Sequence, residues 1–158
     1  MNDFTYSAIR SFNQYLNTNL SVGTDEQLIL TPSRFTDLDK DTVRVEFYDQ
    51  TYSDSLGRFV GTSQGRNSKL YIQIDCLSPP NAEGEERSGA NRKLKDRVEE
   101  VFKDTIRIPI LSYGTAGTQV ERNGFIRQDG AMPIPDEGNM PGWTRWKLNY
   151  RMEVVDTE

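Results

Sequence analysis

The chain of 158 residues is long enough for one hydrophobic core but not for two, so we expect a single domain over residues 1-158. Histidine is absent and Cys76 is the only cysteine, which excludes an internal disulfide, a thiolate zinc cluster and histidine-based acid–base catalysis. The net charge of -5 and the pI of 4.9 disfavour tight, non-specific binding of nucleic acid, because gripping phosphates needs a surplus of Lys and Arg.

The N-terminal part of the chain predicts a helix followed by strands. Asp3 is a suitable N-cap for a helix that runs to about Asn19, because apolar residues recur there every three to four positions. Residues 28–30 predict a short strand, and the alternation of apolar and polar residues over 42–49 predicts a half-buried strand. The glycine-containing stretch near residues 50-67 is expected to form a long loop or hairpin.

The middle of the chain predicts a buried strand and a second helix. Apolar residues alternate with polar ones from Lys69 to Cys76, which predicts a strand, and a Pro/Gly-rich loop follows at residues 78–84. From Ala90, an apolar stripe predicts an amphipathic helix that ends near Thr105; its members are Leu94, Val98, Val101 and Phe102. Because charges of both signs cover its other faces, we interpret those faces as solvated surface.

The C-terminal part predicts three strands and a long loop. Residues 107–111 predict a short strand broken by Pro109, and residues 119–127 predict another strand. A Pro/Gly-rich loop is expected at residues 128-142, and the alternation over 143–155 predicts the longest strand. The elements together predict an α+β fold, in which a mainly antiparallel sheet carries two amphipathic helices packed on one face.

Two short motifs imitate ligand-binding loops. The acidic turn at residues 37–41 resembles the start of a calcium loop, but Thr42 stands where that loop needs glycine and Tyr48 where it needs glutamate. The segment 114–118 lacks the Gly-Lys-Ser/Thr ending of a phosphate-binding loop. We interpret both motifs as turns, and we expect no metal, no cofactor and no catalytic residue.

Aromatic residues near loops and strand ends are candidate anchors of a protein interface, although core packing explains them equally well as a group. Core packing is the stronger interpretation for Trp146. The last predicted strand also has one wet, mostly basic side. The candidate residues for contact with a second subunit or another partner are Tyr48, Tyr52, Phe59, Trp143, Arg145 and Lys147.

In their order, these elements resemble the tail terminator (tail completion) proteins of tailed bacteriophages. The resemblance rests on an N-terminal helix without a signal sequence, strands at 42–49 and 70–76, a helix at 90–105 that ends in Val101-Phe102-Lys103, and a closing strand at 143–155. It covers most of the chain as an order of elements, without a single diagnostic motif.

The resemblance implies a non-enzymatic structural protein of the virion. Members of this family assemble as a six-membered ring on the end of the tail tube, stop its growth and provide the docking surface for the head. The implied partners are further copies of the chain, a tail tube protein and a head-neck connector protein. We expect assembly in the host cytoplasm, a final place in the neck region of the tail, and no membrane segment, since apolar runs are only a few residues long.

Acidic residues are concentrated in the first third of the chain. Residues 1–57 hold nine acids against four bases, whereas residues 58–158 hold fifteen of each. In a ring that DNA must traverse, acids on the bore would prevent phosphate binding. We therefore predict that DNA passes without specific binding and that several acids of this region line the bore: Asp25, Asp37, Asp39, Asp41 and Asp49.

Other functions stay open at this point. A head-completion or neck connector protein on the portal side would share most of these features. A tail tube subunit is less favoured, because tube subunits resemble β-sandwiches and two helices are a large share of this chain. A small carboxylate-based hydrolase would need two acids with raised pKa in one pocket, and no spacing in the sequence singles out such a pair.

Overall fold

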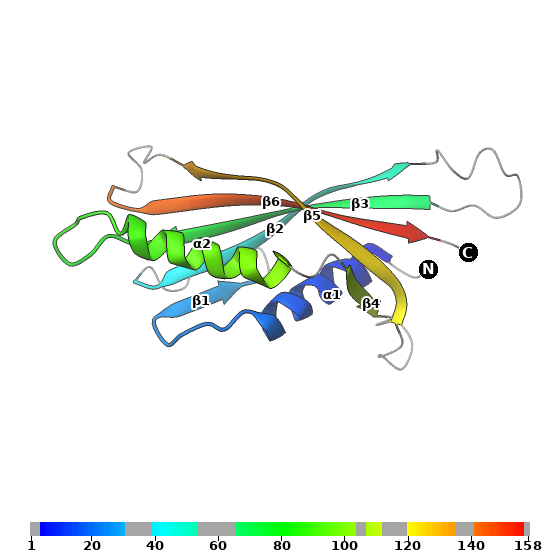
Figure 1. Ribbon diagram of the computed structural model, residues 1–158, viewed down its shortest axis with the longest axis horizontal. Coiled ribbons are helices and arrows are strands. Elements are labelled where there is room, and N and C mark those ends of the chain that lie inside the picture. The colour runs from blue at the N-terminus through cyan, green and yellow to red at the C-terminus, as the bar shows by residue number, and fades with distance from the viewer. Residues whose placement is uncertain are drawn as a thin grey trace, which may run out of the picture.

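Four long strands form the centre of a six-stranded sheet (Figure 1). The computed structural model describes residues 4–30, 39–53, 66–103, 107–111, 120–134 and 141–156. In chain order the elements are α1 (Phe4–Asn19), β1 (Glu26–Ile29), β2 (Asp41–Ser53), β3 (Arg66–Ser78), α2 (Ser88–Lys103), β4 (Arg107–Leu111), β5 (Val120–Ile134) and β6 (Thr144–Asp156).

The strand order across the sheet is β1-β2-β3-β6-β5-β4. Only the pairing of β1 with β2 is parallel, and each of the other neighbouring pairs is antiparallel. The predicted α+β class with a mainly antiparallel sheet is therefore confirmed, and β1 makes the sheet a mixed one. The strands twist strongly, so that the far ends of β2 and β5 diverge toward opposite sides of the molecule (Figure 1).

Both helices pack on the same face of the sheet, as the sequence predicts. The alternating apolar residues of the long strands point to this face, for example Ile74 of β3 and Leu148 of β6, which are directly paired and fully buried. Phe12 of α1 stacks on Phe102 of α2 at a ring-centroid distance of 5.4 Å. Phe47 of β2 meets Phe12 edge-on at 5.8 Å, so one aromatic cluster joins both helices to the sheet.

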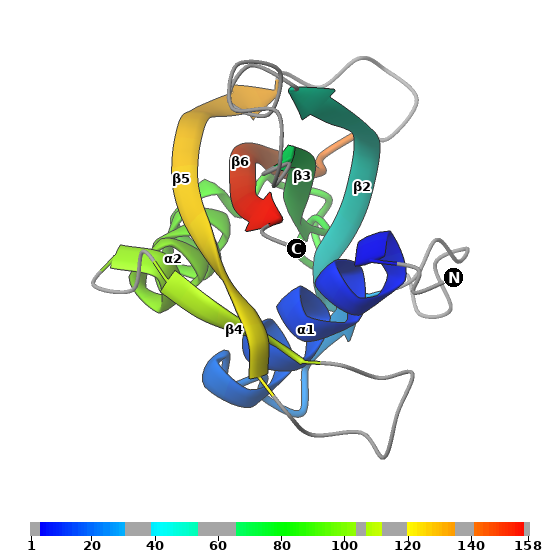
Figure 2. The same cartoon turned by 90° about the vertical axis from the view of Figure 1, so that its right-hand side faces the viewer.

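The helix α1 lies between the two outermost strands of the curled sheet (Figure 2). The hydroxyl of Ser11 accepts a hydrogen bond of 2.9 Å from the backbone N–H of Leu111, at the end of β4. The side-chain amide of Asn13 donates a bond of 3.2 Å to the carbonyl oxygen of Leu30, just after β1. These bonds satisfy backbone groups that the short outer strands would otherwise leave unpaired.

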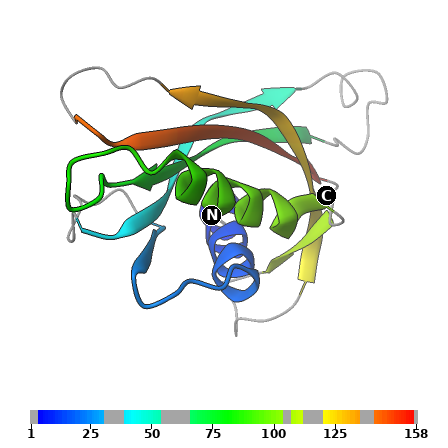
Figure 3. The same cartoon turned by 60° about the vertical axis from the view of Figure 1, so that its left-hand side comes forward.

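The helix α2 crosses β3 and β6, and polar contacts fix its position (Figure 3). The buried side-chain amide of Asn91 donates to the carbonyl oxygen of Cys76 at 2.9 Å and to the hydroxyl of Ser78 at 3.1 Å. The Lys95 ammonium group lies 4.6 Å from the centre of the Trp146 ring, which packs against the core. The interpretation of Trp146 as a residue of the core side therefore holds.

The structure differs from the sequence prediction within both expected loops. In the stretch 50-67, β2 reaches Ser53 and β3 begins at Arg66, so residues 50–53 and 66–67 are strand. The start of the expected loop 128-142 differs as well. β5 continues to Ile134, so residues 128–134 are strand. Two features make this strand difficult to predict from the sequence. Its register against β6 shifts between Gln128 and Gly130, and Pro133 interrupts the apolar alternation. Bulges and prolines are typical of strands at the edge of a sheet, which is where this part of β5 lies.

Candidate functional site

The side of the sheet opposite the helices is polar, and we call it the helix-free face. It consists of the alternate side chains of β2, β3 and β6, which point away from the apolar core. Its central members are Arg44, Glu46, Tyr48, Tyr71, Gln73, Asp75, Arg145, Lys147, Asn149 and Arg151. Glu46 forms an ion pair with Arg44, which lies two positions earlier on the same strand. Charged side chains of both signs therefore cover this side of the sheet.

A buried carboxylate lies at the centre of the helix-free face. Asp75 is only 2% exposed, and Arg145 donates to its Oδ1 from Nη2 at 2.9 Å and from Nε at 3.3 Å. The Gln73 amide also donates to Asp75, at 3.0 Å, and accepts a bond of 2.5 Å from the hydroxyl of Tyr48. A buried carboxylate needs such partners, so this network ties β2, β3 and β6 together.

The structure brings three of the candidate interface residues to the helix-free face. Tyr48 is 50% exposed there, and Arg145 and Lys147 lie on the same face of β6. Trp143 is half-buried in the turn that precedes β6. Tyr52 belongs to β2 by its backbone, but its side chain, like the whole of Phe59, lies outside the described residues.

The acids that we predict to line a bore lie in different settings. Asp25 and Asp39 are exposed near the start of β1 and β2. The carboxylate of Asp41 is held by the two terminal nitrogens of Arg87, at 2.8 and 3.3 Å, so this acid anchors the segment before α2. The position of Asp37 and the side chain of Asp49 lie outside the described residues.

Two strand edges have no strand partner over much of their length within the described part of the chain. β1 pairs only with residues 41–44, which leaves the outer edge of residues 45–53 open; we call it the β2 edge. β4 pairs with β5 no further than Phe125, which leaves the outer edge of residues 126–134 open; we call it the β5 edge. Their unpaired backbone groups can bond another strand.

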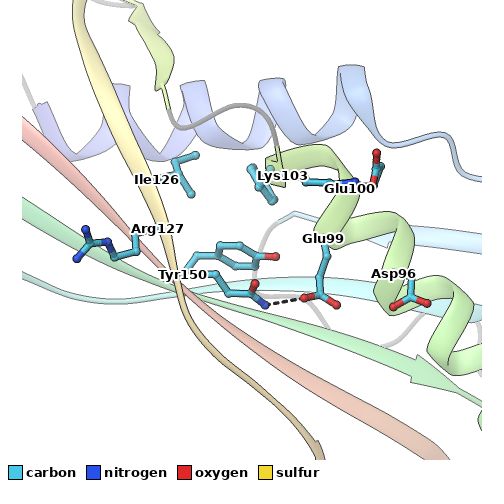
Figure 4. A pocket seen from close by; sticks show the side chains of 9 residues that line it. Asp96, Glu99, Glu100, Lys103, Ile126, Arg127 and Tyr150 are labelled. Atoms are coloured by element: carbon cyan, nitrogen blue, oxygen red, sulfur yellow. Dashed lines mark hydrogen bonds and ion pairs between the residues drawn. The ribbon is translucent and has the colours of Figure 1, made fainter.

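A groove of about 660 Å³ runs between α2 and β5, and we call it the α2–β5 groove (Figure 4). Phe102, Ile126 and Tyr150 contribute buried side chains to its lining. Glu99 on its wall accepts a bond of 3.0 Å from the side-chain amide of Gln128 and pairs with Lys95 at 2.6 Å. The groove thus has an apolar floor below a wall of paired polar groups. Its other lining residues are Asp96, Glu100, Lys103 and Arg127.

The hydroxyl of Tyr150 is an unpaired polar group beside this groove. Tyr150 is 2% exposed, and its hydroxyl has no hydrogen-bond partner among the described residues. Figure 4 shows its ring directed from β6 toward α2. Burial, followed by the nearby carboxylate of Glu99, raises the pKa of Tyr150, so the hydroxyl keeps its proton and can act as a donor. Native proteins rarely leave a buried donor unpaired.

The described residues contain no group of three or more His, Cys, Asp or Glu side chains that could hold a metal ion. Cys76 is fully buried, and burial followed by the Asp75 carboxylate raises the pKa of its thiol. A protonated, buried thiol packs as a small apolar side chain and does not react as a nucleophile. Within the same described residues, no helix is long and apolar enough to cross a membrane.

The sequence does not single out the groove residues Glu99, Gln128 and Tyr150. Gln128 falls where the composition predicts a loop, and Tyr150 occupies a regular core position of the last strand. Lys95 and Glu99 lie four positions apart on α2, at the spacing of neighbours on one helix face, and form an ion pair. The groove arises because β5 meets β6 beside α2, and this long-range arrangement cannot be read from local spacing.

Comparisons with known proteins give a likeness of fold. No protein-family model matches the sequence, and a search of curated proteins gives no match either. A solved structure described as the virion of a native gene transfer agent particle contains a chain that superimposes with a TM-score of 0.51. The alignment covers 99% of this chain and 100% of that chain, at 12% sequence identity. The two chains therefore share their fold from end to end.

Proposed function

We propose that this chain is a structural protein of a phage-type virion that forms a ring at the head-proximal end of the tail tube. In this place it ends tube growth and provides the surface to which the head docks. The observation that carries the proposal is the end-to-end likeness of fold to a chain of a gene transfer agent virion, over 99% of this chain and 100% of that one. The order of elements in the sequence, which resembles tail terminators, supports the same role.

The open strand edges support assembly as a ring of identical subunits. β2 is antiparallel to β3, β3 to β6 and β6 to β5, so β2 and β5 run in opposite directions at the two borders of the long-stranded sheet. The β2 edge of one copy and the β5 edge of the next can therefore pair as antiparallel strands. Such a head-to-tail contact uses two different surfaces and closes into a ring when the rotation permits. We propose six subunits.

The predicted acidic bore belongs to the same proposal. In the ring, Asp25 and Asp39 would add exposed negative charge, whereas Arg87 already neutralises much of the charge of Asp41. DNA would pass without specific binding, because like charges disfavour contact with phosphates. The partners above and below the ring would be a head-neck connector protein and the tail tube protein. The proposed role depends on the shape of the ring and on its contact surfaces, and we assign no catalytic residue.

The proposal can be tested by assembling tails with and without this chain. Purified tube protein that polymerises in its absence should give tubes of variable length, and addition of the chain should give shorter tubes with a ring at one end in electron micrographs. Tubes of unchanged length distribution and without end-bound rings would contradict the terminator role.

The same experiment distinguishes the head-completion alternative. A head-completion protein would leave tube length unchanged but would bind isolated heads at the portal. Binding of gold-labelled chain to heads and not to tubes would therefore replace the terminator role by that alternative. Binding to tube ends before any head is present is the result that we expect.

A further inference from the structure

The α2–β5 groove and the β5 edge are parts of one surface. Ile126, Arg127 and Gln128 line the groove and also belong to the open stretch of β5. A strand that paired with this edge would lie about 4.8 Å from β5 and would therefore extend over the groove. Its side chains on the helix side would enter the groove, and those on the other side would continue the helix-free face.

The lining of the groove suits the binding of an extended strand. Phe102, Ile126 and Tyr150 form the apolar floor of the groove. A groove that took a free charged molecule would need uncompensated charge on its walls. Here Glu99 is already paired with Lys95, and Glu100 lies 3.7 Å from Lys103. An extended peptide with apolar side chains fits these conditions best.

The chain itself supplies a matching strand. The β2 edge includes residues 45–53 and the β5 edge residues 126–134, so each offers nine described residues for pairing, and the two run in opposite directions. The outer strands β1 and β4 are less suited, since they have only 4 and 5 residues. The N–H of Leu111 in β4 is also bonded to Ser11. A second copy would cover both open edges at once, whereas an unrelated partner would cover only one.

We propose that the α2–β5 groove receives the β2 edge of a second copy, which pairs with the β5 edge and places side chains over Phe102, Ile126 and Tyr150. The proposal rests on the ring assembly proposed for this chain and names the two surfaces that join its subunits. Each subunit donates its β2 edge to one neighbour and accepts the β2 edge of the other.

Two proline substitutions test these surfaces separately. The register of β2 against β3 passes from Phe47 to Gln50, and that of β5 against β6 passes from Gln128 to Gly130. Asp49 and Asp129 therefore have no paired residue in the inner strand, so a proline at either place is expected to disturb mainly the outer edge; Asp129→Pro also removes the ion pair of 3.7 Å between Asp129 and Arg151 of β6. Asp49→Pro damages the donating edge and Asp129→Pro the accepting edge. Gly89→Pro, in the first turn of α2, is the matched control, because a Cβ added there meets nothing within 4 Å and proline is tolerated in the first turn of a helix.

Native mass spectrometry then measures how many copies assemble in each variant. Asp49→Pro and Asp129→Pro should each be monomeric, whereas Gly89→Pro should assemble like the wild type. An equimolar mixture of the first two should form a dimer with one copy of each, because one intact donor and one intact acceptor remain. Rings in either single variant, or a mixture that stays monomeric while both variants keep wild-type circular dichroism, would overturn the proposal.

A labelled peptide of residues 43–53 tests the groove independently of ring closure. It should bind Asp49→Pro, whose groove is vacant, and should fail to bind Asp129→Pro; equal binding to both would overturn the proposal. If the wild type forms rings that neither proline disrupts, the groove assignment fails and the proposed function stands. If the wild type forms no ring even on tube ends, the proposed function fails, and peptide binding still decides the use of the groove.

Discussion

Each border of the sheet has a covered part and an open part. Residues 41–44 of β2 are covered by the short strand β1 and residues 120–125 of β5 by the short strand β4, and Ser11 and Asn13 of α1 bond backbone groups beside these short strands. Within the described residues, the outer edges of 45–53 in β2 and 126–134 in β5 are open, and they lie toward opposite ends of the sheet because β2 and β5 run in opposite directions. The covered parts contribute to the stability of the subunit, whereas the open edges can contact other chains.

The largest expected effect comes from breaking the packing of α1, which lies beside the short outer strands. Phe12 is fully buried between Phe102 and Phe47, so Phe12→Ala should lower the free energy of unfolding by about 3–5 kcal/mol, because a cavity replaces the ring. Urea titration followed by circular dichroism measures this loss. The exposed neighbour Asn17→Ala is the control and should change stability little. A loss of less than 1 kcal/mol in Phe12→Ala would contradict the packing described.

A smaller loss is expected on the helix-free face, between the two open edges. Arg145→Met leaves the buried carboxylate of Asp75 without its cation and should lower stability by about 1–3 kcal/mol, with the exposure of Arg145 limiting the effect. The double variant Asp75→Asn/Arg145→Met should recover part of this loss, since no buried charge remains. Additive effects in this double-mutant cycle would show that the two side chains do not interact.

The next largest loss of stability is expected from the hydrogen bond at the end of β4. Ser11→Ala removes the acceptor of the Leu111 N–H and should cost about 1 kcal/mol, because the backbone donor is left partly buried and unpaired. Native-state hydrogen exchange should show faster exchange at Leu111, while amides in the middle of β3 keep their protection. Unchanged exchange at Leu111 would indicate that the covered border at β4 does not depend on this bond.

The smallest effect sharpens the comparison beside the open β5 edge. Tyr150→Phe should stabilise the free subunit by up to about 1 kcal/mol at neutral pH, since it removes an unpaired buried hydroxyl. Because the folded-state pKa of Tyr150 is raised, the unfolded chain loses this proton first, and wild-type stability should fall as the pH rises above 10. The decline should be shallower in Tyr150→Phe, and parallel pH profiles of unfolding would contradict the burial of this group.

The sequence predicts the fold where a regular pattern exists. The apolar alternation over residues 70–76 and 146–154 gives the central strands, and the two amphipathic stripes give α1 and α2. The prediction fails at residues 128–134, because an edge strand tolerates the bulge and Pro133 that otherwise indicate a loop. The parallel pairing of β1 also has no signal in the sequence, since it depends on where a later strand passes.

The candidate site is less predictable than the fold. The alternation of β6 places Arg145 and Lys147 on one polar face, and this placement is confirmed. The partner of Asp41 is Arg87, which lies 46 positions away, so no local pattern reveals the ion pair. The position of Tyr150 predicts burial, but the absence of a hydrogen-bond partner depends on the course of α2 and β5.

The central claim is that the open β2 and β5 edges join identical subunits into a ring, and native mass spectrometry with electron-microscope class averages of the purified chain tests it most directly. The account predicts a closed hexamer of six times 18.1 kDa with a central hole, either alone or on the ends of tail tubes. A two-fold dimer that does not grow, or a monomer that forms no ring on tube ends, would contradict it.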